Sequence, residues 1–521
     1  MKLKILFSLG IAMCFLFIII CIQGCDIKSP TENVNVIFNA DAPSNSVSIN
    51  IIDGKTNALI PGTGSDAIKI DIEGADKGKI TDMAKNSMNT FKTADGILSF
   101  GILDGAAYPL KITVIASAEG YVTTSMPLTI NAKGGSYNIF MVKKSDPPAG
   151  VVFSTSTIAN LVGGVIPSET TASTTIINGA SGIAKIKLPA GTIITDNNNA
   201  ALSGSTTCEI VYYDPTIKSA LNCFPGGFTF SSGGTISTMY TAGFASFEIK
   251  DASGKIAKNF SGAALPQITI EIPNGTNNYT YSRPIQSGDL IPILSYNPSN
   301  GAWLDENAKG GTVIAGSNSN MAISFNVNHL TYYNLDFKGP GCSNDIRIHF
   351  TSPCSEGSQP LRIELYSITN NFYECPFFQA NQPANDPVMI LNSAPDRFMI
   401  KVYNINGTLI CTQLIEGCPS DVYLSSNNNG GSFNSISGNL LAVCPGGNIQ
   451  IRPTIPVYYR IANTGRYYYL GYMINGFLST TCIPYGNYDF MSYYNGVALY
   501  NLNVPILTNN VSVVYNLPTC Y

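Results

Sequence analysis

Charged residues are scarce in this sequence, and so are the residue types on which many catalytic and nucleic-acid sites depend. Only 12% of the 521 residues are Asp, Glu, Lys or Arg, whereas soluble domains typically have ~25%. The two histidines, His329 and His349, are too few for a multi-histidine metal site. The net charge of −4 and the lack of a long Lys/Arg run argue against nucleic acid as a partner. Hydrophobic residues nevertheless make up 45% of the chain, which is enough for several cores.

Motifs that would indicate an enzyme or a bound cofactor are also missing. No Cys-x-x-Cys pair occurs, so neither a zinc ribbon nor a thioredoxin-type site is indicated. No Gly-x-Ser-x-Gly sequence is present for a serine hydrolase. The Gly-x-Gly-x-x-Ala match at 62–67 precedes an alternating strand instead of a helix, so it predicts a loop. We therefore predict a protein that is not an enzyme and holds no cofactor or metal, with an uncharacterised hydrolase as a remote alternative.

The N-terminus has the pattern of an export signal. Met1–Lys4 is basic, and residues 5–21 form an apolar run that ends at Ile22-Gln23-Gly24-Cys25. These last four residues resemble the lipobox of bacterial lipoproteins. The resemblance implies a signal peptide at 1–24 and acylation of Cys25, with palmitate or a similar chain. An uncleaved signal anchor is the alternative, although the run is slightly shorter than the ~20 residues that span a bilayer.

The anchor implied by this resemblance would make the membrane a partner of the chain. Several acyl chains hold a protein stably on a bilayer, whereas a single chain is marginal. The anchored protein would lie on the extracytoplasmic face of the bacterial envelope. Asp26 resembles a residue that retains some lipoproteins in the inner membrane, but this rule differs between bacteria. The outer membrane or cell surface and the periplasmic face of the inner membrane therefore both stay open.

The cysteines indicate disulfides. Of 13 cysteines, two belong to the signal segment and Cys25 is the predicted lipidation site, which leaves ten. An even number of cysteines in an exported chain is typical of a disulfide framework. Proximity in the sequence predicts two pairs: Cys208 with Cys223, and Cys411 with Cys418. Most of the remaining cysteines lie after residue 340, so the C-terminal half is expected to be organised differently.

Alternation of apolar and polar residues is the dominant pattern. It is clear at Val47–Ile51, Ile68–Ile72 and Ile268–Ile272, and Gly-containing turns separate such runs. Helical periodicity is nearly absent, and we predict a short helix only at Thr81–Phe91. The sequence therefore predicts an all-β protein of tandem β-sandwich modules, transthyretin-like or immunoglobulin-like, with little helix.

Changes in composition divide the chain into modules. Residues 145–150 form a Pro-containing linker, residues 338–341 are Gly-rich, and residues 427–438 are rich in Gly, Asn and Ser. The predicted organisation is a lipidated tether at 25–33, a β-sandwich at 34–145, a larger β-sandwich at 151–338, a cysteine-containing β module at 342–428, and a tyrosine- and cysteine-rich β module at 436–521.

The segment 34–145 resembles the carboxypeptidase regulatory-like domain, a transthyretin-like β-sandwich. The resemblance rests on an ordered series of features: Leu59–Gly62 where this family has a "pi-Gly" step, the hairpin pair Asp95-Gly96, and Ala118–Tyr121, which matches the Ala-x-Gly-Tyr signature. The segment departs from the family by an insertion at 75–90. The family's module is non-catalytic, so the resemblance implies a fold and no functional residue.

Three small groups of polar residues are candidate sites. Asp71 and Glu73 share one strand face at a spacing that carboxylate pairs of glycosidases also have, but such charges ordinarily face water. Residues 196–199 could offer oxygen ligands to calcium, or simply form a hairpin loop. His329 is expected on an apolar strand side as a core or rim residue, and His349 is expected to face solvent.

Tyrosines near the C-terminus are the most suggestive feature for binding. Consecutive tyrosines on a strand point to opposite sides of the sheet, so some should be exposed. Tyr467, Tyr468, Tyr469 and Tyr472 are therefore the candidate binding surface for a glycan or a protein. The alternative is that tyrosine is simply a favoured strand residue in a small core.

Together these features predict a non-enzymatic, lipid-anchored protein of the bacterial cell envelope that presents β-sandwich modules for adhesion or for binding a glycan or protein ligand. In this hypothesis the C-terminal modules carry the contact surface, and the two preceding modules act mainly as a spacer. The alternative is a structural scaffold that contacts the cell wall or another envelope protein.

Overall fold

The computed structural model describes most of the chain after the N-terminal segment. The described residues are 36–39, 43–61, 68–130, 136–232, 235–306, 310–351, 360–369, 373–382, 388–425, 433–445, 449–464, 467–494, 497–507 and 510–516. The predicted signal peptide, the tether and Cys25 lie outside them. We refer to residues 43–145 as module 1, 151–340 as module 2, 342–425 as module 3 and 433–516 as module 4.

The described chain is almost entirely β-structure, which confirms the predicted fold class. Only a short helix, α2 (Lys218–Asn222), and a 3-10 turn, η2 (Lys77–Lys79), interrupt the strands. The predicted helix at 81–91 is wrong. Asp82 there accepts hydrogen bonds from the backbone N–H groups of Ala84 and Asn86, and Lys85 has a φ of 66°. These contacts close a tight turn, which is the local structure that competes with a helix.

Module 1 is a two-sheet sandwich. Strands β4, β6, β2 and β9 form one layer, and β5, β3, β7 and β8 form the other. The alternating residues of β2 and β3 place Val47, Ile49 and Ile70 fully inside the core between the layers. The strands are β2 (Asn45–Asp53), β3 (Ile68–Glu73), β4 (Ile80–Thr81), β5 (Thr90–Thr93), β6 (Ile97–Ile102), β7 (Leu110–Ala118), β8 (Thr124–Ile130) and β9 (Ser136–Met141).

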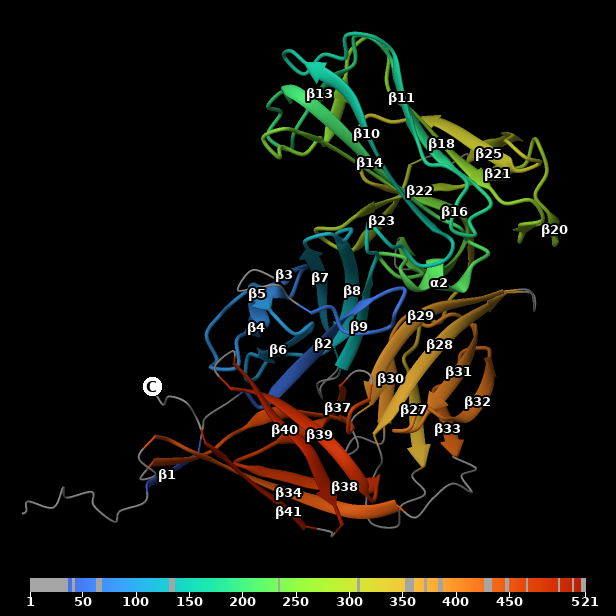
Figure 1. Cartoon of the computed structure of the whole chain (residues 1–521). Coiled ribbons are helices and arrows are strands. Elements are labelled where there is room, and N and C mark those ends of the chain that lie inside the picture. The colour runs from blue at the N-terminus through green and yellow to red at the C-terminus, as the bar shows by residue number, and fades with distance from the viewer. Residues whose placement is uncertain are drawn as a thin grey trace, which may run out of the picture.

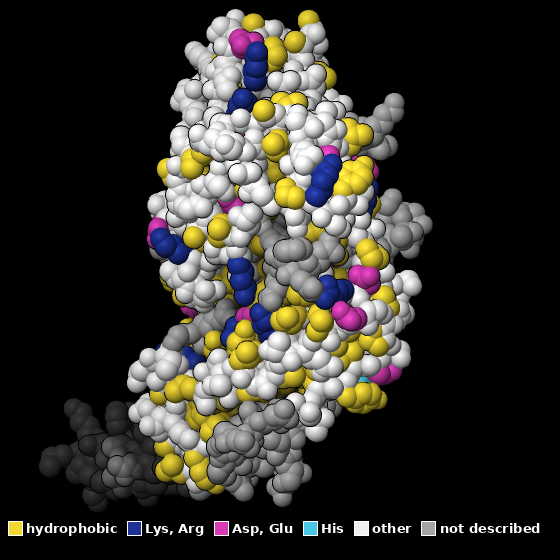
Figure 2. All heavy atoms as spheres, turned by 90° about the vertical axis from the view of Figure 1, so that its right-hand side faces the viewer, with side chains coloured by type: hydrophobic (Ala, Val, Ile, Leu, Met, Phe, Trp, Pro, Cys, Tyr) yellow, Lys and Arg dark blue, Asp and Glu magenta, His cyan; other side chains and the backbone are white. Residues whose placement is uncertain are grey.

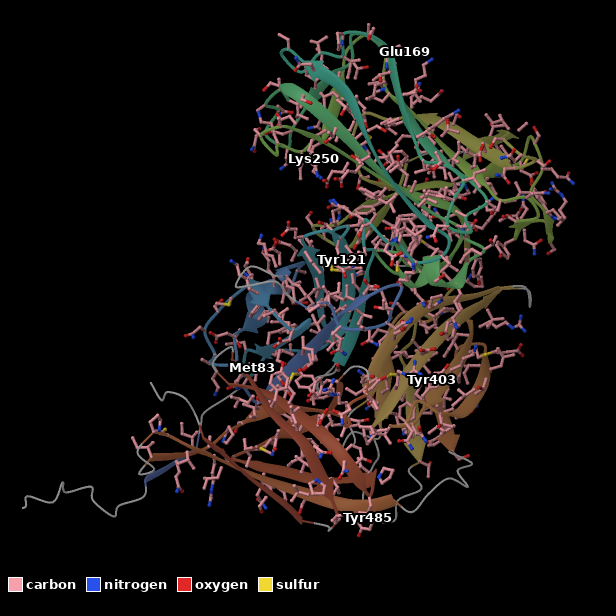
Figure 3. The ribbon with its side chains drawn as sticks, viewed as in Figure 1. Met83, Tyr121, Glu169, Lys250, Tyr403 and Tyr485 are labelled. Carbon is pink, nitrogen blue, oxygen red and sulfur yellow. A yellow bond between two sulfur atoms is a disulfide. The ribbon has the colours of Figure 1, made fainter. Side chains whose placement is uncertain are left out.

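Tyr121, from the predicted signature, lies at the end of module 1 that faces module 2 (Figure 3). Gly120 before it has a φ of 76° and forms the expected tight turn. The Tyr121 hydroxyl donates to Asp53 at 2.9 Å, and burial together with the Asp53 carboxylate raises the pKa of Tyr121 to about 12. This hydrogen bond joins the turn after β7 to the end of β2.

Module 2 is a larger sandwich with its own core of 34 buried residues. A sheet ordered β10-β14-β16-β26-β22-β23, with β15 beside β16, faces a sheet ordered β11-β12-β18-β25-β24-β21. The strands are β10 (Val151–Leu161), β11 (Thr170–Ser173), β12 (Ala184–Leu188), β13 (Ile193–Thr195), β14 (Gly204–Tyr213), β15 (Thr229–Ser232), β16 (Thr235–Asp251), β17 (Asn259–Ser261), β18 (Gln267–Ile272), β19 (Asn277–Asn278), β20 (Arg283–Pro284), β21 (Leu290–Ile291), β22 (Ile293–Asn297), β23 (Ala302–Asp305), β24 (Gly311–Ala315), β25 (Met321–Asn326) and β26 (Tyr332–Pro340).

Module 3 shares a sheet with module 1. Strand β29 pairs with β9, so one sheet of eight strands runs in the order β32-β31-β28-β29-β9-β2-β6-β4 across both modules. The sheet β30-β27-β33 covers the module 3 end of it. The strands are β27 (Ile346–Thr351), β28 (Leu361–Thr369), β29 (Tyr373–Gln382), β30 (Val388–Leu391), β31 (Arg397–Tyr403), β32 (Leu409–Glu416) and β33 (Asp421–Ser425).

Module 4 is completed by the first strand of the chain. Strand β1 (Val36–Asn39), which the sequence assigned to the first sandwich, instead pairs in parallel with β35. It thereby joins the sheet β1-β35-β34-β38, to which β41 also belongs, opposite the sheet β37-β36-β39-β40. The strands are β34 (Phe433–Val443), β35 (Ile449–Arg452), β36 (Ile455–Ile461), β37 (Tyr468–Met473), β38 (Phe477–Pro484), β39 (Gly486–Tyr494), β40 (Val497–Ile506) and β41 (Asn510–Asn516).

The modules pack together instead of forming an extended series. Figure 1 shows module 2 at one end, module 4 at the other, and modules 1 and 3 side by side between them. An aromatic core that includes Trp303 and Phe244 joins module 2 to Ile52 and Phe140 of module 1. On the face shown in Figure 2, hydrophobic side chains are scattered and charged ones are few. In the described part of the chain, no helix is long and apolar enough to cross a membrane.

Candidate functional site

The tyrosines predicted as a binding surface are largely inside the protein. Tyr467 and Tyr469 are only 6% and 5% exposed, and Tyr468 and Tyr472 are partly buried. The prediction of a tyrosine contact surface is therefore wrong for Tyr467 and Tyr469. Tyr485, at the free end of module 4 (Figure 3), is 48% exposed and lies outside that predicted set.

The reason is that the sheet carrying these tyrosines is covered on both faces. One face packs on the module 4 core, and the other packs Tyr458 and its neighbours against module 1. The Tyr458 hydroxyl is hydrogen-bonded to the hydroxyls of Ser48 and Ser99 at 2.5 Å each. The Ser- and Asn-rich face of β2 by itself predicts exposure to water. In the structure this face instead forms a polar interface between modules 1 and 4.

The predicted disulfides are also wrong. Among the cysteines whose side chains are described, Cys208, Cys223 and Cys411 are free, and Cys418 pairs with Cys342. Cys411 lies inside β32, where each residue advances ~3.3 Å, so an extended strand carries it away from Cys418. Cys208 and Cys223 are buried in two different cores. Burial raises the pKa of both of these thiols to about 12.

The small polar groups form no catalytic arrangement. Asp71 pairs with Lys69 at 2.7 Å, and Glu73 pairs with Lys77 at 2.6 Å. The described residues hold no cluster of three or more side chains suited to a metal ion. Asp196 instead accepts hydrogen bonds from two backbone N–H groups of its own loop, which is the hairpin-loop interpretation of this segment.

Each histidine has an acidic neighbour. His349 contacts Asp421 at 2.8 Å and stacks on Tyr423, with ring centroids 4.4 Å apart. His329 lies 3.4 Å from Glu306. His349 is only partly exposed, as is His329. A contact between a partly exposed histidine and an acidic side chain is ordinary at a protein surface. Neither histidine lines one of the two cavities described below.

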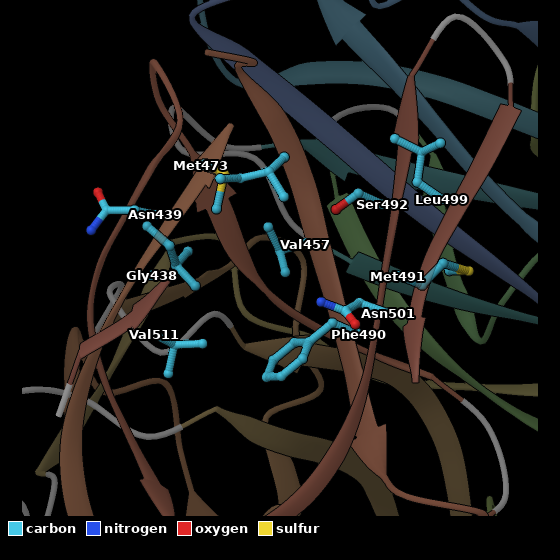
Figure 4. A pocket seen from close by; sticks show the side chains of 12 residues that line it. Gly438, Asn439, Val457, Met473, Phe490, Met491, Ser492, Leu499, Asn501 and Val511 are labelled. Atoms are coloured by element: carbon cyan, nitrogen blue, oxygen red, sulfur yellow. The ribbon is translucent and has the colours of Figure 1, made fainter. Parts of the chain in front are cut away.

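Module 4 contains a small apolar cavity between its two sheets (Figure 4). The 12 lining residues include Val457, Met473, Phe490 and Leu499, with Asn439 and Asn501 among the few polar members, and none is charged. The cavity has a volume of about 70 Å³. An apolar cavity of roughly 150 Å³ binds benzene, so a cavity of half that volume is too small for a drug-sized or sugar-sized ligand.

A larger groove lies at the boundary of modules 2 and 3. Its volume is about 440 Å³, within the roughly 300–1,000 Å³ typical of ligand sites, which also favour domain boundaries. Its lining mixes aromatic, polar and charged side chains: Tyr240, Tyr279, Thr280, Phe337, Lys338, Gly339, Pro340, Ile368, Asp396 and Arg397. On size and position, this groove is the candidate functional site.

Three aromatic rings form the module 2 wall of this groove. The rings of Tyr240 and Tyr279 are 5.1 Å apart, and Tyr279 meets Phe337 edge-on at 5.7 Å. Gly339 lies directly against the Tyr240 ring, because a Cβ there would come within 2.3 Å of it. Glycine at 339 therefore lets the ring lie flat against β26.

Charged groups of both signs line the rest of the groove. Lys338 pairs with Asp305 at 2.7 Å, and the Arg397 Nε donates to Glu416 at 3.0 Å. Burial raises the pKa of Asp396. Flat rings beside charged and hydrogen-bonding groups can hold a ligand that has both an apolar face and polar substituents, such as a sugar or a peptide.

Sequence reasoning missed this groove because its residues come from five separate stretches of the chain. The composition of residues 338–341 predicts only a module boundary. One feature of the sequence does point to the groove. Residues 338–341 mark a module boundary, and module boundaries are frequent ligand sites.

Comparison with known proteins leaves the site unassigned. No family model and no curated protein matches the chain. Among solved structures, it aligns over 91% of its length with 98% of the major pilin subunit BcpA of Bacillus cereus, at 9% identity and a TM-score of 0.14. It aligns over 46% of its length with 96% of a Streptococcal ancillary pilin, at 9% identity and a TM-score of 0.13. Scores this low do not indicate a shared fold.

Proposed function

We propose that this chain is a lipid-anchored protein of the bacterial envelope that binds a glycan or protein ligand in the groove between modules 2 and 3. The lipobox-like Ile22–Cys25 supports the anchor. The groove of about 440 Å³, with its aromatic wall, carries the binding part of the proposal. The protein works as a non-enzymatic binding protein.

The pairing of β1 with β35 supports an orientation opposite to the one expected from the sequence. Ten residues separate Cys25 from Val36, and they span at most ~36 Å when fully extended. An acylated Cys25 therefore keeps module 4 close to the membrane. Module 2, at the other end of the molecule (Figure 1), is then the distal part, and the groove lies at its boundary with module 3.

A structural scaffold is the second candidate. The eight-stranded sheet that continues from module 1 into module 3 favours it, because a shared sheet joins the modules as a single body. In a scaffold, no residue of the groove contributes to recognition, so variants of the groove separate the two candidates.

The groove is tested by narrowing it with Thr280→Trp. Thr280 is exposed at the groove wall, so the larger side chain occupies the groove without disturbing a core. Thr312→Trp, at an exposed position of β24 outside the groove, is the matched control. The probe is an array of envelope glycans and peptidoglycan fragments. We expect wild type and T312W to bind the same members and T280W to bind at least tenfold more weakly; no binding by wild type, or equal binding by T280W, refutes the glycan site.

The anchor is tested separately with Cys25→Ser. The variant is expected in the soluble fraction or as unprocessed precursor, whereas wild type stays with the membrane. If C25S behaves like wild type, Cys25 is not acylated, and the groove result is unaffected.

A further inference from the structure

Three polar side chains are sealed inside module 2. Thr241 is 2% exposed, and Asn334 and Asp336 are fully buried. Asn334 and Asp336 are two residues apart on β26, so both project from the same face of the sheet. That face also carries Phe244 and Leu294 of the aromatic core between modules 1 and 2. The three polar groups are therefore held in an apolar environment.

The backbone brings Thr241 to this pair. Strand β16 runs antiparallel to β26, and Thr241 lies directly opposite Asp336. A register shift follows between Thr241 and Gly243, and such bulges re-aim the side chain beside them. The Thr241 hydroxyl accordingly donates to Asn334 Oδ1 at 2.5 Å. The hydrogen bond holds the hydroxyl oxygen beside the amide carbon of Asn334.

The remaining polar atoms of the group are not satisfied. Among the described residues, no hydrogen-bond partner exists for Asn334 Nδ2 or for either carboxyl oxygen of Asp336. The backbone N–H groups of Tyr240 and Phe337 approach the carboxyl without hydrogen-bond geometry. Buried polar groups are nearly always paired, so three unpaired atoms in one place call for an explanation.

We propose that Thr241 and Asn334 form an intramolecular ester that joins β16 to β26. In this step the Thr241 Oγ1 attacks Cγ of Asn334, and the new Oγ1–Cγ bond replaces the Cγ–Nδ2 bond. The hydroxyl proton passes to Nδ2, and ammonia leaves. No oxidant, reductant or other co-reactant is needed.

Asp336 is suited to move that proton. Burial raises the pKa of its carboxyl well above the ordinary value, which favours the neutral acid over the carboxylate. Asp336 lies opposite Thr241 and on the same face of β26 as Asn334, although its oxygens do not yet hydrogen-bond to either group. Once a side-chain shift brings the carboxyl into hydrogen-bond reach, a neutral carboxylic acid can donate a proton to the leaving nitrogen from one oxygen and accept the hydroxyl proton at the other. The reaction also removes Asn334 Nδ2, one of the three unpaired atoms, from the core.

The ester has a direct signature in the full chain extracted from the membrane with detergent. Trypsin cleaves after lysine and arginine, and neither occurs within 219–249 or within 310–337, so the expected peptides are 219–250 and 310–338. Thr241 and Asn334 therefore fall on two different tryptic peptides. We expect these peptides to appear as one linked species, lighter than their sum by one ammonia, which alkaline hydroxylamine separates because it cleaves esters and not amides.

Variants identify the residues. Thr241→Val and Asp336→Asn are expected to give the two separate peptides at full mass, while Ser246→Ala, on the same peptide as Thr241, keeps the linked species. Separate peptides of full mass from the wild-type protein overturn the proposal. A linked species that persists in T241V, or that resists hydroxylamine, also overturns the assignment to a Thr241 ester; persistence in D336N removes Asp336 from the mechanism. The wild-type mass alone decides the main question, even if a variant fails to fold.

Discussion

Removal of the disulfide between Cys342 and Cys418 should destabilise module 3 by several kcal/mol. The two residues are 76 positions apart, and the bond ties the start of the module to the turn before β33. A loop of this length removes enough entropy from the unfolded chain to contribute about 4.5 kcal/mol at 25 °C. Cys342 is fully buried in the module 3 core, so alanine there also leaves a small cavity. We expect the double variant Cys342→Ala/Cys418→Ala to lose about 5 kcal/mol.

Hydrogen exchange followed by mass spectrometry measures this loss module by module. Amides in β27 to β33 should exchange faster by a factor that corresponds to the lost free energy, while amides in β10 to β26 should be unchanged. Cys411→Ala is the control, because Cys411 is a free thiol in the described structure and lies on β32 in the same module. A loss below about 1 kcal/mol in the double variant, or the same loss in C411A, would refute the loop-entropy reasoning.

Three further results are expected. Tyr458→Phe should lower the free energy of unfolding by about 1 kcal/mol in urea titration, because it removes a buried hydroxyl bonded to two serines. An unchanged urea midpoint would contradict a stabilising polar interface between modules 1 and 4. The Arg283 guanidinium holds the pKa of Asp289 below its usual range, so this pair stabilises the fold above about pH 4 and loses its effect as the pH falls. The difference in Tm between wild type and Asp289→Asn should therefore shrink between about pH 5 and pH 2, and a constant difference would count against it. Cys208 and Cys223 should react with iodoacetamide only after unfolding, since burial raises the pKa of both thiols to about 12; labelling of the native protein would show that the cores open.

The strands could be predicted from the sequence because alternation records which face of each strand is buried. Val47–Ile51 and Ile268–Ile272 both form strands with the expected apolar face inside. The residues that cover the other face of a strand cannot be read from the sequence of that strand alone. Ser48 and Tyr458 are 410 positions apart, and each looks exposed when its own strand is considered alone.

The candidate groove and the disulfide could not be predicted for a related reason. Cys342 and Cys418 meet only after the intervening strands have folded, whereas proximity in the sequence favoured Cys411. Gly339 and Arg397 likewise become neighbours only through the packing of module 2 on module 3. The missing information in each case is tertiary contact between distant segments.

The parallel pairing of β1 with β35 determines how the molecule responds to mechanical load. Four residues of β1, Val36 to Asn39, are in register with Ile449 to Arg452. A pull on the N-terminal segment acts along these strands, so their backbone hydrogen bonds share the force together instead of opening one after another. The load enters module 4 before it reaches module 1. Module 4, although it comes last in the sequence, is therefore the first module to bear tension. The four paired residues of β1 and β35 resist this load in shear.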